Sequence, residues 1–460
     1  MTEQGRSTLS TAEDGRILDR LAGLEKVISP QQVRQVLRDT GRVNGRACLL
    51  THEIALWVVL AMGLLTHIPI RQVFRHARRM RLDEATPARS SLCVARQRLG
   101  VEPVRELHAR VVRPLATAGT PGAFYRGWRL MAFDGTVMDV PDSEANASFG
   151  RSSGGRGDGA FPQVRKVSLV ELGTHVEAAL AIGGYHDSEQ ALVRQLWDRI
   201  PGDALLLEDR GFFSYDAWKT LYLRVKLLVR VKSNHVLKPI QSLSDGSYLA
   251  KIYPSSYDRD KDRNGIVVRL IEYTLDDPQR TGHGEVHRLM TNLLDEQECP
   301  ATELIVLYHE RWEEELVFDE QKTHQDPRRA EKPAQLRSET PEGVRQELYA
   351  LSLGHFVVRS LMFEAAQEAT LDVDRLSFTG CFRILQCRLP ECDSGTPVTM
   401  NQWYQALLAE MRREQIGPRR NRINPRVIKR KMSKWPKKRP HHRPPPRLRK
   451  NFEECVVMKT

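Results

Sequence analysis

Acidic residues directly follow two short apolar stretches that are typical of central strands. Asp134 comes after the run Leu130–Phe133, and Asp209 follows Ala204–Leu207 with one glutamate between them. Strand ends at one edge of an α/β sheet are where ligands and metals gather, and carboxylates there can bind hard cations such as Mg²⁺. The two aspartates are therefore candidate metal ligands. The same pattern also fits an Asp-Gly turn at Asp134, and a helix cap or an ion pair with Arg210 at Asp209.

A third candidate carboxylate lies in a predicted helix, on one stripe with an aromatic and two basic residues. The stripe consists of Tyr308, Arg311, Glu315 and Lys322. At about 100° and 1.5 Å per residue, its members fall within about 60° of one another and span about 21 Å. Such a stripe could bind a metal while its basic side chains follow nucleic-acid phosphates; a solvated charged helix is the alternative. Trp312 lies beside the stripe and could stack on a displaced base or pack in the core.

These residues carry a resemblance to a known family. The spacing Tyr308–x2–Arg311–x3–Glu315–x6–Lys322 resembles the tyrosine–arginine–glutamate–lysine signature of the bacterial DDE transposases of the insertion sequence four family. The segments 133–136 and 209–212 resemble the two aspartate motifs of this family, and segments 161–165, 289–292 and 346–349 are also similar to it. The resemblance extends from about residue 25 to about residue 375.

The resemblance implies an α/β fold with an RNase H-like mixed-sheet catalytic core. In that core the first aspartate ends strand one, the second ends strand four, and the glutamate lies on a helix after a β-rich insertion. The expected domains are a helical N-terminal DNA-binding domain (1–120), the first segment of the catalytic core (125–232), the insertion (233–295), the second segment of the core with the C-terminal helices (296–417), and a basic proline-rich tail (418–460).

The resemblance also implies the activity, which is DNA transposition, a form of DNA recombination. Asp134, Asp209 and Glu315 would coordinate two Mg²⁺ ions, with Mn²⁺ as a substitute, for DNA cleavage and strand transfer. The phosphate-binding residues would be Tyr308, Arg311, Lys322 and Arg210. The partners would be double-stranded element ends and target DNA, held by a homodimer in a synaptic complex, with a hairpin intermediate as one route. Two alternatives are an inactive or domesticated DNA-binding derivative and a metal-dependent nuclease without strand transfer.

Local patterns predict the elements that must position these residues. Strands are expected at 128–133, 136–140, 204–207 and 226–232, with a hairpin formed by 164–171 and 175–182. One long helix should run from Pro300 to about Lys322, and further helices cover 341–367, 374–386 and 400–415. In the N-terminal region Ser29-Pro30 marks a helix start, and 54–65 is apolar enough for a buried helix.

Two further N-terminal helices are basic. One is expected over Arg71–Arg81. The other covers Leu92–Leu99, with Ser90 and Ser91 as the cap, Gly100 as the stop, and Arg96 and Arg98 pointing outward. Short basic helices suit a helix-turn-helix type of DNA contact, although an ordinary helical bundle would show the same pattern.

The net charge is concentrated in one segment. The chain carries +12, and Pro418–Lys450 contains fifteen Lys and Arg residues and no acid, so the remainder carries 12 − 15 = −3. Seven prolines in this segment exclude a regular helix. The segment is therefore interpreted as an extended basic arm that neutralises a polyanion; a solubilising tail is the alternative.

Several protein classes are not expected. The longest apolar run, Ile54–Leu65, has twelve residues, whereas a membrane span needs about 20. The N-terminal residues lack the apolar segment of a signal peptide. The seven cysteines include no CxxC pair, which fits a reducing cytoplasm. These features predict a cytoplasmic protein, and the family resemblance implies a bacterial one that is associated with the nucleoid.

Overall fold

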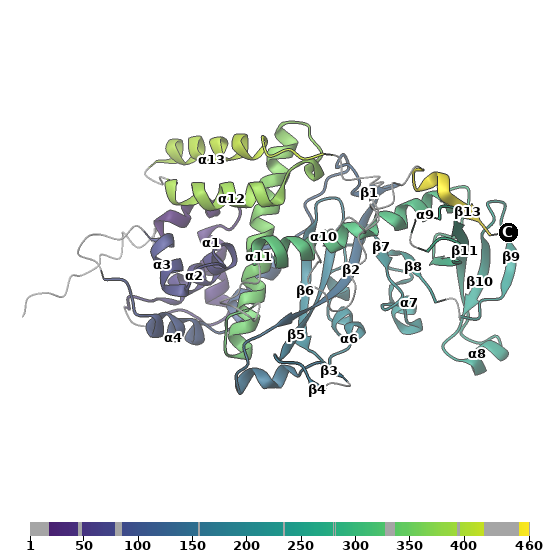
Figure 1. Ribbon diagram of the computed structural model, residues 1–460, viewed down its shortest axis with the longest axis horizontal. Coiled ribbons are helices and arrows are strands. Elements are labelled where there is room, and N and C mark those ends of the chain that lie inside the picture. The colour runs from purple at the N-terminus through teal and green to yellow at the C-terminus, as the bar shows by residue number, and fades with distance from the viewer. Residues whose placement is uncertain are drawn as a thin grey trace, which may run out of the picture. The chain divides into compact units, whose positions relative to one another are not determined.

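The chain forms two compact units in the computed structural model (Figure 1). The structure describes residues 18–44, 48–78, 85–154, 157–232, 235–278, 280, 282–326, 336–392, 396–417 and 450–459, without the side chains of 312–315 and 397. Unit 1 consists of Met1–Ala123, Asp134–Arg199 and Glu314–Ile416, and unit 2 of Phe124–Phe133, Ile200–Glu313 and Gly417–Thr460. Two of the boundaries therefore fall inside continuous elements, a strand and a helix, rather than in linkers.

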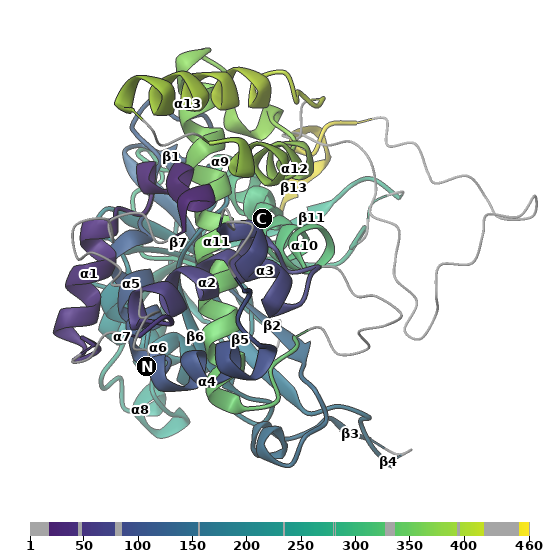
Figure 2. The same cartoon turned by 90° about the vertical axis from the view of Figure 1, so that its left-hand side faces the viewer.

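Helices form most of unit 1 (Figure 2). They are η1 (Asp19–Lys26), α1 (Pro30–Asp39), α2 (His52–Leu64), α3 (Ile70–Ala77), α4 (Arg89–Leu99), α5 (Glu102–Val111), α11 (Pro341–Glu368), η6 (Val373–Arg375), α12 (Phe378–Arg388), η7 (Leu389–Glu391) and α13 (Pro397–Met411). The predicted start of α1 is confirmed, because Ser29 and Gln32 form a capping box. All residues of α2 from Ile54 to Leu64 are buried, as its apolar sequence predicts.

The N-terminal helices are not a separate domain. They share one hydrophobic core with α11, α12 and α13. The crossing of α2 and α11 is so close that a Cβ atom on Gly63 would lie 2.0 Å from the carbonyl oxygen of Ala350. The expected division at residue 120 therefore differs from the structure, because α2 is apolar on every side and needs partners from the C-terminal half to cover it.

The basic helices differ from their predicted form. Arg78 has extended backbone angles (φ −120°, ψ 135°), so α3 ends at Ala77 instead of Arg81, and residues 79–84 lie outside the described residues. α4 begins before the expected serine cap, whereas Gly100 (φ +75°) ends it as predicted. Arg98 is exposed, but Arg96 points inward.

Arg96 is held by the start of α11. Its guanidinium donates to Gln346, Ser338 and the Gly343 carbonyl, each at 3.2 Å. The prediction that Arg96 faces outward is wrong, because these acceptors come from a segment almost 250 residues away in the sequence.

The sheet elements of unit 1 are the second half of β2 (Trp128–Asp139), β5 (Gln163–Glu171) and β6 (Val176–Gly184), in the order β2–β5–β6. The predicted hairpin is confirmed, with Val164 opposite Gly184 and Glu171 opposite Val176. Short elements complete this region: η2 (Ala145–Phe149), β3 (Ser153–Gly154), β4 (Gly157–Asp158), α6 (Glu189–Arg194) and η3 (Trp197–Arg199).

Unit 2 contains a mixed sheet in the order β2–β7–β8–β12–β11–β10–β9. Its elements are β1 (Phe124–Tyr125), β7 (Ala204–Glu208), α7 (Tyr215–Leu221), β8 (Lys226–Arg230), β9 (Pro239–Ser242), β10 (Tyr248–Ile252), α8 (Ser256–Asp260), β11 (Ile266–Leu275), β12 (His287–Thr291), α9 (Ala301–His309), η4 (Glu310–Trp312), η8 (Glu453–Cys455) and β13 (Val456–Met458). β2, β7 and β8 are parallel, whereas β8 and the strands after it pair antiparallel. β9–β12 lie within the segment 233–295, and its expected role as an insertion stays a prediction.

The end of the chain belongs to this sheet (Figure 1). β13 pairs antiparallel with β11, with Met458 opposite Tyr273 and Val456 opposite Leu275. The Phe452 ring stacks on His309 with centroids 3.7 Å apart, and Cys455 is buried. The expected tail over 418–460 therefore differs at its end, because the apolar residues after the basic segment complete a strand edge. Residues 418–449 lie outside the described residues.

Candidate active site

Asp209 follows the fully buried strand β7. In unit 2, β7 pairs in parallel with β2, and the last pair is Ala132 with Leu207. A tight turn then begins, in which the Phe212 amide donates to the Asp209 carbonyl at 3.0 Å. Among the described residues, Asp209 Oδ1 is buried and has no hydrogen-bond partner. Because a buried carboxylate oxygen is ordinarily paired, this atom has the properties of an open cation ligand.

Tyr308 supports the same turn from helix α9. Its hydroxyl donates to the carbonyl of Glu208 at 3.2 Å, and its side chain is buried. Burial raises the pKa of Tyr308 well above its usual range. The Arg311 guanidinium lies over the Tyr308 ring, 5.6 Å from its centroid. The hydroxyl of Tyr308 thus holds the backbone beside Asp209, and its role as a phosphate ligand stays a prediction.

Glu208 is a buried acid that the sequence analysis did not single out. Burial raises the pKa of its carboxyl group to about 8, so it is protonated at neutral pH. Arg210, on the other side of Asp209, is exposed.

Asp134 lies within β2 and not at a strand end. The prediction of two strands separated at Asp134-Gly135 is wrong, because β2 runs unbroken to Asp139 and has β5 as a neighbouring strand. The Gly135 amide donates to Asp134 Oδ1 at 2.8 Å. A Cβ on Gly135 would lie 2.7 Å from Glu189 Oε1, so a larger residue after Asp134 would require the Glu189 side chain to shift.

Lys322 contacts the same strand within unit 1. Its ammonium donates to Thr136 Oγ1 at 2.8 Å and to the Val137 carbonyl at 3.2 Å. Thr136 is two residues after Asp134, so both side chains lie on one face of β2. Lys322 therefore lies on the Asp134 face of the strand.

The helix that carries Glu315 changes type along its length. It begins after Pro300 as predicted, but α9 is followed by the 3-10 turn η4, by α10 (Glu313–Asp319) and by the π-helical segment η5 (Glu320–Gln325). A projection at a constant angle per residue is therefore wrong for this stretch, since each helix type has its own rotation per residue. The side chains of Trp312 and Glu315 lie outside what the structure describes.

Buried polar side chains hold η5 in place. Lys166 and Gln321 both bind the Glu177 carboxylate, at 2.7 and 3.0 Å. Burial opposes the charge on Glu177, but the adjacent Lys166 ammonium lowers the pKa of Glu177 to about 2. Gln325 donates to the carbonyls of Gly63 and Leu351, at 2.8 and 2.9 Å.

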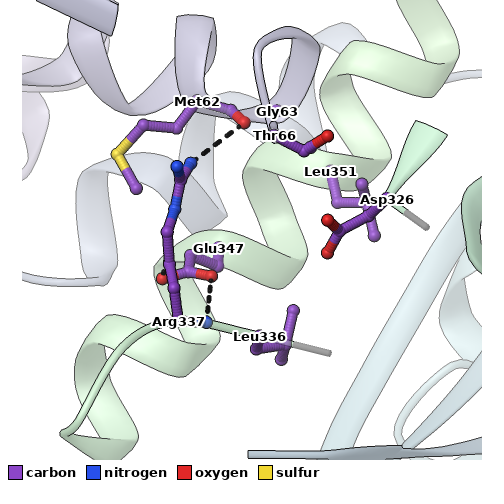
Figure 3. A pocket seen from close by; sticks show the side chains of 8 residues that line it. All are labelled: Met62, Gly63, Thr66, Asp326, Leu336, Arg337, Glu347 and Leu351. Atoms are coloured by element: carbon purple, nitrogen blue, oxygen red, sulfur yellow. Dashed lines mark hydrogen bonds and ion pairs between the residues drawn. The ribbon is translucent and has the colours of Figure 1, made fainter. Parts of the chain in front are cut away.

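The end of η5 borders a cavity of about 10 Å³ between α2 and α11 (Figure 3). Asp326, Thr66 and Leu351 line it, together with Arg337, which donates to the Met62 carbonyl at 3.3 Å. The Thr66 hydroxyl donates to the Gln325 carbonyl at 2.5 Å. This end of the helix is therefore fixed by backbone and side-chain contacts.

Comparison with known proteins identifies the chain. Residues 18–109 match the family model described as insertion element 4 transposase N-terminal, and residues 127–352 match the transposase DDE domain. The chain is 29% identical over 430 residues to transposase InsG for insertion sequence element IS4 from Escherichia coli K12, covering 90% of this chain and 93% of that protein. The chain belongs to the DDE transposases of the insertion sequence four family. The resemblance seen in the sequence is thereby confirmed.

The transposase is similar to two further proteins. It is 28% identical over 177 residues to the putative transposase InsZ from Escherichia coli K12, covering 37% of this chain and 58% of that protein. A cryo-EM structure of the piggyBac transposase synaptic complex with hairpin DNA matches with a TM-score of 0.45 and 11% identity, over 86% of this chain and 81% of that one.

The transposase is a DNA-cleaving and strand-transferring enzyme of a family that uses divalent metal ions. No three His, Cys, Asp or Glu side chains form a metal-binding group within the described residues, a set that does not include the Glu315 side chain. The unpaired oxygen of Asp209 fits a cation ligand, and carboxylates are the donors that Mg²⁺ prefers. No helix among the residues that the structure describes is long and apolar enough to span a membrane.

Proposed function

We propose that Asp134, Asp209 and Glu315 together hold two Mg²⁺ ions, for which Mn²⁺ can substitute, and that DNA cleavage and strand transfer take place at this site. The observation that carries the proposal is the parallel register of β2 and β7. Asp134 and Asp209 each stand two residues beyond the last pair, Ala132 with Leu207, so both acids follow the same end of two parallel strands, the edge of a sheet at which metals gather. The buried, unpaired Oδ1 of Asp209 supports the same assignment.

The strand order supports an RNase H-like core. When only strands of five or more residues are counted along the chain, β2, β5 and β6 are the first three and β7 is the fourth. Asp209 therefore follows strand four, as the family resemblance implies. Within unit 1 the sheet order is β2–β5–β6, and within unit 2 the strands β2, β7 and β8 are parallel neighbours. Glu315 comes after the β-rich segment β9–β12.

The side chains around the aspartates have separate tasks. Divalent cations at the three carboxylates would neutralise charge on the attacking and leaving oxygens. Lys322 would bind a DNA phosphate on the Asp134 face of β2, and Arg311 and the exposed Arg210 would bind phosphates along the same DNA strand. Tyr308 would hold the backbone before Asp209, and Trp312 would stack on a displaced base. The transposase would act as a homodimer that cuts out the element, with a hairpin at the element end as one route.

The test is a cleavage assay with purified protein, Mg²⁺ and labelled DNA that carries the element's own ends. Asp134→Asn, Asp209→Asn or Glu315→Gln should each abolish nicking and joining while end binding stays within about twofold, because phosphate contacts remain. Asp203→Asn is the matched control, since Asp203 precedes the same strand β7 and is exposed. Nicking without joined products would indicate a nuclease, and no cleavage by the unmodified protein would indicate an inactive derivative. Activity in any of the three carboxylate variants would remove that residue from the site.

We also propose that the N-terminal helices recognise the element ends. Arg71 and Arg75 on α3 and Arg98 on α4 are exposed, and the neighbouring residues Ile70, Val73 and Phe74 anchor α3 in the core. Arg71→Ala/Arg75→Ala should reduce the preference for the element's own ends over random DNA. Arg105→Ala is the control, because this exposed arginine pairs with Glu102 on α5. Unchanged preference in the double variant would place recognition elsewhere.

A further inference from the structure

Glu320 is the first residue of the π-helical segment η5, directly after α10, and it belongs to a buried ionic network within unit 1. Its carboxylate accepts hydrogen bonds from Arg359 Nε at 3.0 Å and from His355 Nε2 at 2.9 Å. A second nitrogen of Arg359 donates to Glu320 and also lies 2.7 Å from Nδ1 of His175. The Nε2 of His175 is 3.3 Å from Asp374. None of these side chains is more than 4% exposed.

The network joins three elements to one side of the helix. Arg359 and His355 come from α11, His175 from the β5–β6 turn, and Asp374 from η6. His175 has a left-handed backbone (φ +56°), which the hairpin turn accommodates and which brings its ring to Arg359. Burial opposes the charge on Glu320, but the Arg359 guanidinium and the two histidines hold the pKa of its carboxyl group well below the usual range.

The next residue is held from another element. Gln321 binds Lys166 and Glu177 on the β5–β6 hairpin, Lys322 binds β2, and Gln325 binds α2 and α11. Neighbouring residues of η5 are therefore fixed toward different elements. Such a set of contacts fixes both the position of the helix along its axis and its rotation about that axis.

A buried ion pair is a poor source of net stability, because removing two charges from water offsets most of their attraction. The π-helical segment is also unusual, since π turns are rare and are frequently found at functional sites. An apolar pair could fill the place of Glu320 and Arg359 without these costs. The network is therefore better explained by the orientation it imposes than by the stability it adds.

Rotation of this helix would displace Glu315, which lies five residues earlier on the same stretch. A side-chain head is about 6 Å from a helix axis, so a rotation of about 20° would move the Glu315 carboxylate by about 2 Å. Metal ligands must be held within about 0.5 Å and 10–20°. Loss of the network would thus be sufficient to weaken metal binding without unfolding the chain.

We propose that Glu320, held by Arg359 and His355, is a positioning residue that sets the rotation of the α10–η5 helix and thereby directs Glu315 toward the metal ions. This inference rests on the proposed metal site. Neither Glu320 nor Arg359 touches DNA or metal in this scheme; both act through the helix.

The experiment measures Mn²⁺ binding to the full-length protein without DNA, by electron paramagnetic resonance. Glu320→Gln should raise the Mn²⁺ dissociation constant about tenfold or more, as substitutions around metal ligands typically do. The double variant Glu320→Gln/Arg359→Met should show the same loss even if the single variant folds poorly, because it leaves no buried unpaired cation. Arg359→Lys keeps the charge and should lose less. Affinity for the labelled element end should fall far less than Mn²⁺ affinity in every folded variant, because Arg210 and the N-terminal helices lie outside the α10–η5 helix and keep their DNA contacts.

A matched control distinguishes positioning from general destabilisation. Glu272→Gln breaks a partly buried ion pair with Arg288 (2.8 Å) on the sheet of unit 2, and it should lower the melting temperature without changing Mn²⁺ affinity. If folded Glu320→Gln and the double variant bound Mn²⁺ as tightly as the unmodified protein, the positioning role of Glu320 would be overturned. Unchanged affinity in Glu315→Gln would instead overturn the proposed metal site and this inference with it.

Discussion

The Lys166–Glu177 pair should make the fold acid-sensitive in a defined pH range. The folded-state pKa of Glu177, about 2, lies below its ordinary value of 4.5. A depressed carboxyl pKa stabilises the folded state above the unfolded pKa, and this stabilisation is lost as pH falls through the folded pKa. The difference of about 2.5 pKa units corresponds to about 3 kcal/mol at neutral pH, of which about 2 kcal/mol is lost by pH 3.

The substitution that reveals this contribution is Glu177→Gln, which leaves Lys166 buried without its anion. At pH 7 the variant should be about 3–5 kcal/mol less stable, as expected when one partner of a buried pair is removed. The difference between the unmodified protein and the variant should narrow as pH falls from about 4.5 toward 3, because the unfolded chain then binds a proton at Glu177 that the folded protein does not bind. Lys166→Met/Glu177→Gln should recover some of the stability.

Urea unfolding followed by far-UV circular dichroism at pH 7, 5, 4 and 3 measures these differences. Glu144→Gln, at an exposed position, is the control and should track the unmodified protein at every pH. A difference between Glu177→Gln and the unmodified protein that stayed constant from pH 7 to pH 3 would refute the reasoning, because the carboxyl group would then not be ionised with a depressed pKa.

Three further predictions concern other regions of the molecule. Tyr308→Phe removes the hydrogen bond to the Glu208 carbonyl and should cost about 1 kcal/mol of stability. The variant should nick DNA more slowly at unchanged DNA affinity. A decrease in DNA affinity equal to that of Arg311→Ala would instead indicate that Tyr308 binds a phosphate. Gly63→Ala places a Cβ against the Ala350 carbonyl and should lower the free energy of unfolding in urea by about 1–3 kcal/mol. Gly119→Ala is the control, because its Cβ would meet open space. Equal stability of the two variants would show that α2 and α11 can separate freely. The third change replaces the Lys and Arg residues of 418–449 by Gln and keeps residues 450–460. It should weaken binding to all DNA sequences alike and flatten the slope of log K against log salt by about 0.9 for each phosphate that is no longer bound. An unchanged slope would mean that the segment does not touch DNA.

The sequence predicted elements best where one local signal dominates. β7 is apolar along the run Ala204–Leu207 and is buried throughout, as that run predicts. The β5–β6 hairpin and the start of α1 were likewise predictable from a Gly-Thr turn and a serine cap. Two aspartates beside such strands, joined to a spaced helical motif, were enough to indicate the family.

The errors arise where distant segments override a local signal. Asp134-Gly135 looks like a turn, yet β2 continues through it, with β5 as a neighbouring strand from a distant part of the sequence. Arg96 looks like a surface residue until the start of α11 provides its acceptors. Glu320 gave no local signal as a buried ion, because its partners Arg359 and His175 come from other elements and only the tertiary fold brings them together.

The final strand has a consequence for the way the protein is made. β10 pairs with β11 up to Leu270, and β13 takes over the edge at Tyr273–Leu275. The residues of β13 leave the ribosome long after those of β11. This edge of β11 is therefore unpaired until β13 has been synthesised. An open edge is a template for pairing with another chain. A translation product that stops before residue 450 would keep the edge open for its whole lifetime, and we expect such fragments to aggregate. Synthesis of the last strand is in this sense a folding step.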